Sequence, residues 1–239
     1  MRFSRKQLGI PYAVFLICFV IAPLLVVLYY AFTNGQGQFT VQNFVNFFTS
    51  ENTIGTLAYS LVTAMTVTAC CTLVAYPVAY ILARSDIKKK NVLLVLFIAP
   101  MWINFTLRVV ALKEVLTMVE GNLAYHPFLN TVLGMTYDFL PFMILPIYNS
   151  LSSIGDDVVE AGKDLGASYF TILRKIIFPL SLPGVISGIT MVFVPAMTTF
   201  VLSDLLGGSK ILLIGNVIEQ QFKQVNNWHM GSGLSLVLM

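Results

Sequence analysis

The fold is decided by residues 160–166, Glu-Ala-Gly-Lys-Asp-Leu-Gly, and by residues 176–179, Ile-Ile-Phe-Pro, which follow after nine intervening residues. The chain on both sides of this region is apolar, so the stretch is a polar interruption between hydrophobic runs. Wound as a helix at about 100° per residue, residues 156–167 place their charged side chains on one arc and their apolar residues on the other. The periodicity therefore predicts a short amphipathic helix.

Two glycines shape the apolar face of this helix. Gly162 and Gly166 lie one turn apart, so part of the face has no side chains and another surface could approach the backbone closely there. Such a face favours docking against a partner protein. An amphipathic helix lying in the membrane interface has the same periodicity, so periodicity alone leaves both interpretations open.

The spacing resembles the EAA signature of ABC-importer permeases: Glu-Ala-Ala, three residues, Gly, nine residues, Ile, one residue and Leu-Pro. Gly162 stands in place of the second Ala, and Phe178 in place of the Leu. The positions that match in register are Glu160, Ala161, Gly166, Ile176 and Pro179.

The resemblance implies that residues 151–180 form a cytoplasmic coupling region whose helix sits in a groove of an ATPase subunit. The residues expected to couple this chain to the ATPase are Glu160, Ala161, Gly162, Asp164, Gly166, Ile176 and Pro179. The fold it implies is the type I ABC-importer permease fold, an all-α integral membrane fold.

The composition independently indicates a membrane protein. Of the 239 residues, 57% are hydrophobic and 10% are charged, whereas about a quarter of the residues of a soluble protein are charged. The net charge of +3 is small, and the basic residues cluster beside apolar runs, which gives no case for nucleic-acid binding. We therefore expect a single transmembrane permease domain over residues 1–239, embedded in a lipid bilayer.

Apolar runs predict about six membrane spans. The last of them is too short to cross, and we expect it to be incomplete in this chain. The predicted spans are residues 8–33, 57–83, 91–110, 131–150, 183–203 and 233–239.

The basic residues predict the orientation. Arg84 and Lys88–Lys90 form the densest basic cluster, which the positive-inside rule places in the cytoplasm. The N-terminus, with Arg2, Arg5 and Lys6, is then cytoplasmic as well.

The predicted outer face carries six acidic and four basic residues, with Asp138 among the acids and Arg108 among the bases. This excess of acids favours a cationic solute. Arg108 lies close to the outer end of the third predicted span, where its long side chain can reach outward to the interface.

Three residues are candidates for the path of such a cation. Asp204 closes an uncharged stretch at the outer end of the fifth predicted span, and Trp102 and Glu219 are weaker candidates. A carboxylate can replace water around an ammonium, and an indole face adds a cation–π attraction. The alternative is a structural role, in which Asp204 pairs with Arg108 or Lys210 or caps the start of the following loop.

Signs of catalysis are absent from the sequence. It has no G-x-x-x-x-G-K-[ST] phosphate loop, so we expect ATP and Mg to be bound by partner ATPase subunits. The two histidines, His126 and His229, lie far apart in the sequence, and no metalloprotease or hydrolase motif occurs. We expect a chain that is not an enzyme and holds no cofactor or metal.

Further segments look like the B-type permease subunit of bacterial spermidine/putrescine ABC importers. They are residues 99–108, 140–148, 164–168, 203–208 and 213–217. This resemblance implies a bacterial inner-membrane complex with a second, C-type permease subunit, two ATPase subunits and a periplasmic polyamine-binding protein.

Two alternatives stay open. One is an importer permease for another small solute, such as thiamine, a ferric ion or a phosphonate; the other is a polytopic channel or scaffold subunit. The sequence does not rank spermidine against putrescine, because the separate binding protein makes the first selection.

Overall fold

The computed structural model describes residues 9–85, 88–208 and 210–239, and the regular structure of these ranges is helical apart from one isolated bridge, Thr33 with Phe39. The prediction of an all-helical fold is confirmed. Residues 2, 5 and 6, on which the predicted orientation partly depends, lie outside the described ranges.

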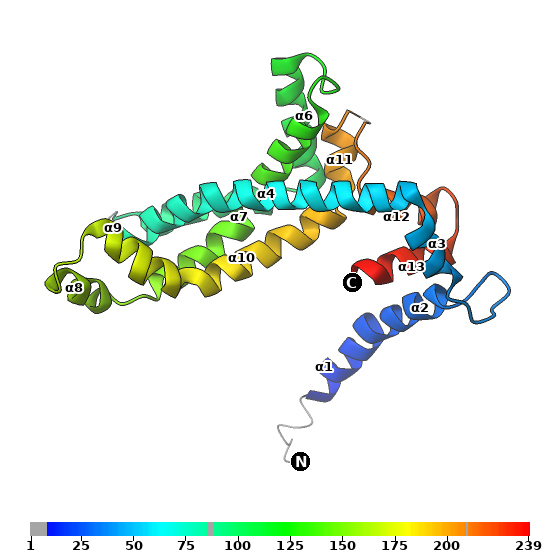
Figure 1. Ribbon diagram of the computed structural model, residues 1–239, viewed down its shortest axis with the longest axis horizontal. Helices are drawn as coiled ribbons and strands as arrows, with labels where there is room; N and C mark the ends of the chain where they lie inside the picture. Colours follow the sequence, from blue (N-terminus) through cyan, green and yellow to red (C-terminus); the bar gives the residue numbers. More distant parts are fainter. Residues whose placement is uncertain (1–8, 86–87, 209) are drawn as a thin grey trace. The chain divides into compact units, whose positions relative to one another are not determined.

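The chain divides into two compact units. The first is formed by the residues up to Leu57 together with Ile214–Met239, and the second by Ala58–Leu213. Figure 1 shows the helices of both units along the chain.

The first unit is held together by the packing of its last helix. α13 packs against α2, α3 and α12. Asn43 Nδ2 donates hydrogen bonds to the carbonyls of Ala31 and Thr33 at 2.9 and 3.1 Å, and His229 Nδ1 lies 3.2 Å from the carbonyl oxygen of Tyr30. These contacts fix the end of α2. The elements are α1 (Gly9–Leu16), a π-helical segment (Ile17–Ile21), α2 (Ala22–Ala31), α3 (Gln42–Thr49), the start of α4 (Glu51–Arg84), α12 (Ile214–Lys223) and α13 (Trp228–Leu238).

The second unit is built on α4, α7 and α10, which run alongside one another, with α8 and α9 at one end of them (Figure 1). Its elements are the rest of α4, α5 (Lys90–Ile98), a 3-10 turn (Ala99–Trp102), α6 (Phe105–Glu120), α7 (Pro127–Ser152), α8 (Asp156–Asp164), α9 (Tyr169–Ile172), a π-helical segment (Leu173–Ile177), α10 (Phe178–Thr198) and α11 (Val201–Leu206).

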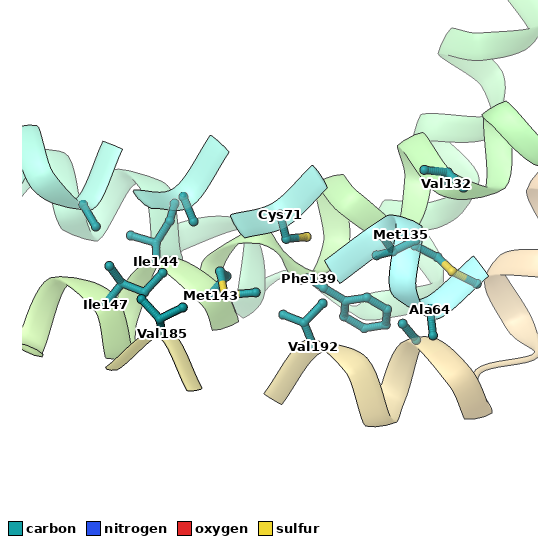
Figure 2. Close-up of a cluster of buried hydrophobic side chains, with 14 of the residues drawn as sticks. Ala64, Cys71, Val132, Met135, Phe139, Met143, Ile144, Ile147, Val185 and Val192 are labelled. Atoms are coloured by element: carbon teal, nitrogen blue, oxygen red, sulfur yellow. The ribbon is translucent and has the colours of Figure 1, made fainter. Parts of the chain in front are cut away.

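Buried apolar side chains from these three long helices form the core of the second unit. Cys71 of α4, Met143 and Ile147 of α7, and Val192 of α10 are fully buried (Figure 2). Cys71 is thus a small core residue, as its apolar surroundings in the sequence indicated.

Glycines let α7 and α10 approach each other closely. A Cβ atom at Gly184 would lie 2.5 Å from the carbonyl oxygen of Pro146, and one at Gly188 would lie 2.6 Å from Met143 Sδ. Small residues at helix contacts are typical of membrane proteins, where close packing replaces the hydrophobic driving force. α7 and α10 are therefore closely packed along their contact.

The predicted third span, residues 91–110, is two helices and not one. The segments Val92–Trp102 and Phe105–Glu120 meet at 97°. The break follows from local chemistry: Ile103 and Asn104 have extended ψ angles, and Asn104 Oδ1 caps α6 by accepting a hydrogen bond from the Leu107 amide at 3.2 Å.

Four described helical segments are long and apolar enough to cross a membrane, and the bent pair makes a fifth if it is one span. The helix expected over residues 183–203 begins earlier and ends earlier, since it runs from Tyr169 to Thr198. The expected incomplete span over residues 233–239 lies in α13, which has 11 residues, fewer than the roughly 20 that a crossing requires. The four segments are Gly9–Ala31, Glu51–Arg84, Pro127–Ser152 and Tyr169–Thr198.

Candidate functional site

The polar stretch of the sequence folds as α8, a helix of nine residues. Asp156 and Asp157 lie in its first turn and Lys163 in its last, so the charges complement the helix dipole at both ends. Glu160 and Asp164 are exposed on the polar arc. The helix is thus amphipathic, and its carboxylates face outward.

Gly162 is buried by the chain itself. A Cβ atom there would lie 2.9 Å from Ile176 Cδ1 and 3.4 Å from Ile172 Cγ1, because α8 packs against α9 and the π-helical segment that follows it. The close approach that we expected a partner to make at Gly162 is therefore made by Ile176, a residue of the same motif. The neighbouring Ala161 remains exposed.

Gly166 has a different role from Gly162. Its φ of +75° is in the left-handed region, and no atom lies within 4 Å of the position that a Cβ would take. The Gly166 amide donates to the Lys163 carbonyl at 2.8 Å and the Ala167 amide to the Gly162 carbonyl at 3.1 Å. This pair of bonds is the Schellman arrangement, which ends a helix at a glycine. Gly166 therefore ends α8 and turns the chain, and no other residue of this chain makes a close contact at this position.

Ile176 and Pro179 lie where the chain enters the membrane helix. Ile176 is part of the π-helical segment Leu173–Ile177, and the Phe178 amide donates to the Leu173 carbonyl, five residues back. Pro179, in the first turn of α10, has no amide hydrogen to donate. The π-helical segment and the proline together set the direction in which α10 leaves the coupling region.

Exposed apolar side chains beside α8 were missed by the sequence analysis. Leu165, Tyr169 and Phe170 have exposed fractions of 88%, 66% and 68%. They follow the polar arc directly, in the turn between α8 and α9 and at the start of α9. Apolar residues within a segment predicted to be cytoplasmic were the available signal, because exposed apolar side chains outside a membrane span often mark a contact surface.

The three residues proposed for the cation path lie in different elements. Trp102 ends the 3-10 turn and is 78% exposed, and Asp204 is exposed in the first turn of α11. Glu219 belongs to the first unit, in α12, where it pairs with Lys223 at 3.0 Å. Trp102 and Asp204 belong to the second unit and Glu219 to the first, so the three residues do not form one cluster within a single unit.

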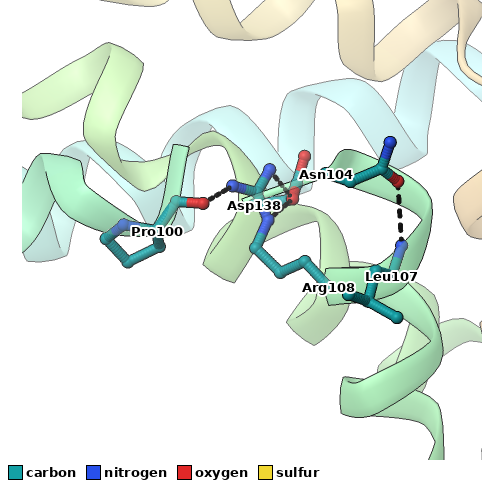
Figure 3. A network of polar contacts seen from close by, with 5 residues as sticks. All are labelled: Pro100, Asn104, Leu107, Arg108 and Asp138. Atoms are coloured by element: carbon teal, nitrogen blue, oxygen red, sulfur yellow. Dashed lines mark hydrogen bonds and ion pairs between the residues drawn. The ribbon is translucent and has the colours of Figure 1, made fainter. Parts of the chain in front are cut away.

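Arg108 does not extend toward the interface as expected. It is buried and its Nε donates to Asp138 Oδ1 at 2.6 Å, while Nη1 donates to the Pro100 carbonyl at 2.5 Å (Figure 3). Nη2 also pairs with Asp138 Oδ1. Arg108 is therefore not the partner of Asp204 that one alternative required.

Asp138 is likewise not an acid of the outer face. It lies within α7 with only 3% of its surface exposed. The physical reason for both corrections is the cost of a charge in apolar surroundings, which falls when an opposite charge and a hydrogen-bond acceptor are close. The sequence did offer a signal for this pair, because Arg108 and Asp138 are a base and an acid in neighbouring apolar spans.

Comparisons with known proteins agree on the class of the chain. Residues 75–239 match the family model described as binding-protein-dependent transport system inner membrane component. The chain is 34% identical to the spermidine/putrescine transport system permease protein PotB of Haemophilus influenzae, with 99% of this chain and 89% of that protein covered. It is 37% identical to PotB of Escherichia coli K12, over 76% of this chain and 71% of that protein.

A solved structure matches the fold. It is a bacterial ABC transporter involved in the import of the acidic polysaccharide alginate, with a TM-score of 0.70 at 15% identity, covering 97% of this chain and 88% of that chain. This likeness confirms the predicted type I permease fold.

Proposed function

The chain belongs to the binding-protein-dependent transport system inner membrane component family, and from this premise we propose that it is the permease subunit of an ATP-driven polyamine importer. The observation that carries the proposal is the identity of 34–37% to spermidine/putrescine permeases over most of the chain. The substrate class is thus spermidine or putrescine, cations that the acidic excess predicted for the outer face also favours.

The complex that we propose contains a second permease subunit, two ATPase subunits and a periplasmic binding protein, in a bacterial inner membrane. ATP and Mg are bound by the ATPase subunits, and this chain takes no part in the hydrolysis. Support for this division of labour comes from the family, whose described role is that of a membrane component in binding-protein-dependent transport.

The coupling region is the part of this chain that we assign to the ATPase. Glu160 and Asp164 present carboxylates, and Leu165 and Phe170 present apolar surface next to them. A polar arc bordered by exposed apolar side chains is suited to docking on another protein, where a few buried apolar anchors dominate the binding energy. Gly162 and Ile176, which pack against each other, hold the region in this shape, together with the turn at Gly166 and the helix start at Pro179.

Reconstitution tests the function. The assembled complex in proteoliposomes, supplied with ATP and the binding protein, should take up radiolabelled spermidine or putrescine, and these polyamines should stimulate ATP hydrolysis. Thiamine, ferric ion and a phosphonate serve as competing solutes. If one of these solutes is taken up and polyamines are not, that solute is the substrate and the polyamine proposal is wrong. If no ATPase co-purifies with the complex, the importer proposal is rejected in favour of a channel.

The orientation that we propose places the N-terminus in the cytoplasm. The impermeant labelling of single cysteines tests it: Asn46→Cys, in α3, should react from the periplasmic side of intact cells, and Lys89→Cys, in the basic cluster, should not. Labelling of Lys89→Cys from outside would reverse the topology.

Asp204 remains our candidate for the cation path, with Trp102 and Glu219 as weaker ones. The exposure of Asp204 on α11 supports the proposal, since the carboxylate is accessible. Asp204→Asn keeps the size and removes the charge, so it should lower polyamine uptake while assembly and basal ATP hydrolysis stay normal. Normal uptake by a well-expressed Asp204→Asn complex would remove Asp204 from the path.

A further inference from the structure

One face of α4 carries three polar side chains at a spacing of four residues: Tyr76, Tyr80 and Arg84. Residues four apart lie above one another on a helix, so the three side chains form a row along the cytoplasmic end of α4. We call this row the polar ladder.

Two members of the ladder contact the coupling region, and the third contacts α10, the helix that follows it. The Tyr76 hydroxyl lies 3.0 Å from Ser181 Oγ of α10, and the Tyr80 hydroxyl lies 2.6 Å from the Tyr169 hydroxyl of α9. Arg84 Nη1 donates to Asp156 Oδ1 of α8 at 2.8 Å. Three successive turns of α4 thus contact α10, α9 and α8, and the last two of these belong to the coupling region.

These contacts span a gap that apolar packing does not fill. A cleft of about 380 Å³ lies between the end of α4 and the coupling region, and Tyr80, Arg84, Asp156 and Tyr169 line it. Apolar side chains such as Ile81 and Val159 also line the cleft, and the polar contacts of Tyr80 and Arg84 add directed connections across it.

The ladder also connects α8 to α4, two helices that are not neighbours along the backbone. α7 and α10 flank the coupling region in the sequence, so a displacement of α8 reaches them through the backbone. α4 is remote in sequence, since Arg84 and Asp156 are 72 residues apart. The Asp156 side chain is 91% exposed, and an ion pair so open to solvent adds little to stability. The pair is therefore of interest for the two helices that it connects, and not for its contribution to the stability of the fold.

We propose that Tyr76, Tyr80 and Arg84 are positioning residues that transmit the ATP-driven displacement of the coupling region to the second membrane-spanning helix. This inference rests on the proposed function, because it needs an ATPase that moves α8. Without the ladder, α7 and α10 would still move with α8, while α4 would follow incompletely and hydrolysis would be less tightly coupled to transport.

The experiment compares uptake with hydrolysis in the reconstituted complex. Tyr80→Phe and Tyr169→Phe each remove one hydroxyl and keep the ring, and Arg84→Asp removes the ion pair. Tyr59→Phe is the matched control, since it makes the same change on the same helix at a ring that packs edge-on against Phe128. The readout is polyamine taken up per ATP hydrolysed, which a general loss of folded protein leaves unchanged.

We expect this ratio to fall about fivefold in the ladder variants, the factor that corresponds to the roughly 1 kcal/mol of an intramolecular hydrogen bond. It should stay at the parental value in Tyr59→Phe, and the charge swap Arg84→Asp with Asp156→Arg should restore it. An unchanged ratio in Tyr80→Phe and Tyr169→Phe, or a charge swap that behaves like Arg84→Asp alone, would overturn the inference.

The parent complex separates this failure from failure of the proposed function. A parent that couples polyamine uptake to hydrolysis, with ladder variants that do so equally well, rejects the ladder only. A parent with no polyamine-stimulated hydrolysis rejects the function on which the ladder rests.

Discussion

Two arginine–aspartate pairs in the second unit have nearly the same bond lengths and opposite surroundings. Arg108 and Asp138 are both buried, and the guanidinium also binds the Pro100 carbonyl, at the bend between α5 and α6 (Figure 3). Arg84 is mostly covered, whereas its partner Asp156 is 91% exposed at the start of α8.

The difference shows that burial, and not bond length, decides how much such an ion pair contributes to stability. Removing one partner of a buried pair leaves an uncompensated charge in apolar surroundings, which typically costs about 3–5 kcal/mol. Exposed pairs typically contribute about 0–1 kcal/mol. We therefore assign the Arg108–Asp138 pair to the stability of the bent span and the Arg84–Asp156 pair to positioning.

The largest effect is expected from Asp138→Asn. It leaves Arg108 buried without a counter-charge, so we expect a loss of about 3–5 kcal/mol of stability. Thermal unfolding of the purified complex in detergent measures it. The double variant Arg108→Met with Asp138→Leu should recover most of the loss, because it removes both charges. A normal melting temperature for Asp138→Asn alone would show that the pair does not hold the bend.

The second largest effect is expected in the coupling region, where Gly162 is buried and Gly166 is exposed. Gly162→Leu adds a side chain where even a Cβ would lie 2.9 Å from Ile176, so overpacking of about 1–3 kcal/mol is expected. Transport should fall while the protein still inserts. Shortening the neighbour, in Gly162→Leu with Ile176→Ala, should restore part of the activity; no recovery would place the clash elsewhere.

The third effect, at Gly166, is smaller and has a different cause. The site is open to solvent but its φ is +75°, so Gly166→Ala should cost about 1–2 kcal/mol through backbone strain alone. Gly166→Asn should cost less than Gly166→Ala, since Asn tolerates the left-handed region. Coupled ATP hydrolysis and thermal unfolding of the two variants test the order. Equal behaviour of the two variants would argue that contact with the ATPase, and not the turn, selects glycine here.

The smallest effect on stability is expected from Asp156→Asn, the matched counterpart of Asp138→Asn. The same chemical change at an exposed carboxylate should alter stability by no more than about 1 kcal/mol. Thermal unfolding of both variants in one series sharpens the comparison. A loss at Asp156 as large as that at Asp138 would contradict the assignment by burial.

Much of this molecule could be predicted because the signals are local. The apolar runs predict membrane-spanning helices from composition alone, and four of them fold as long helices, although the one expected over residues 183–203 begins and ends earlier. The amphipathic arc of α8 follows from the helical period, and a glycine at position 166 suits a helix end because only the residue itself and its neighbours decide the φ angle.

The remaining features depend on residues far apart in the chain. Periodicity gives the face of a helix but not the element that the face will meet, so the sequence could not pair Arg108 with Asp138 or bring Ile176 against Gly162. The same holds for the polar ladder, whose three contacts exist only once α4 lies beside α8, α9 and α10. The sequence by itself determined a helical membrane protein with an amphipathic interruption, because composition and period are properties of neighbouring residues, and the resemblance of that interruption to a known signature indicated a permease. Only the tertiary structure decided which charges are buried and which glycine is enclosed, because burial is set by the packing of distant segments.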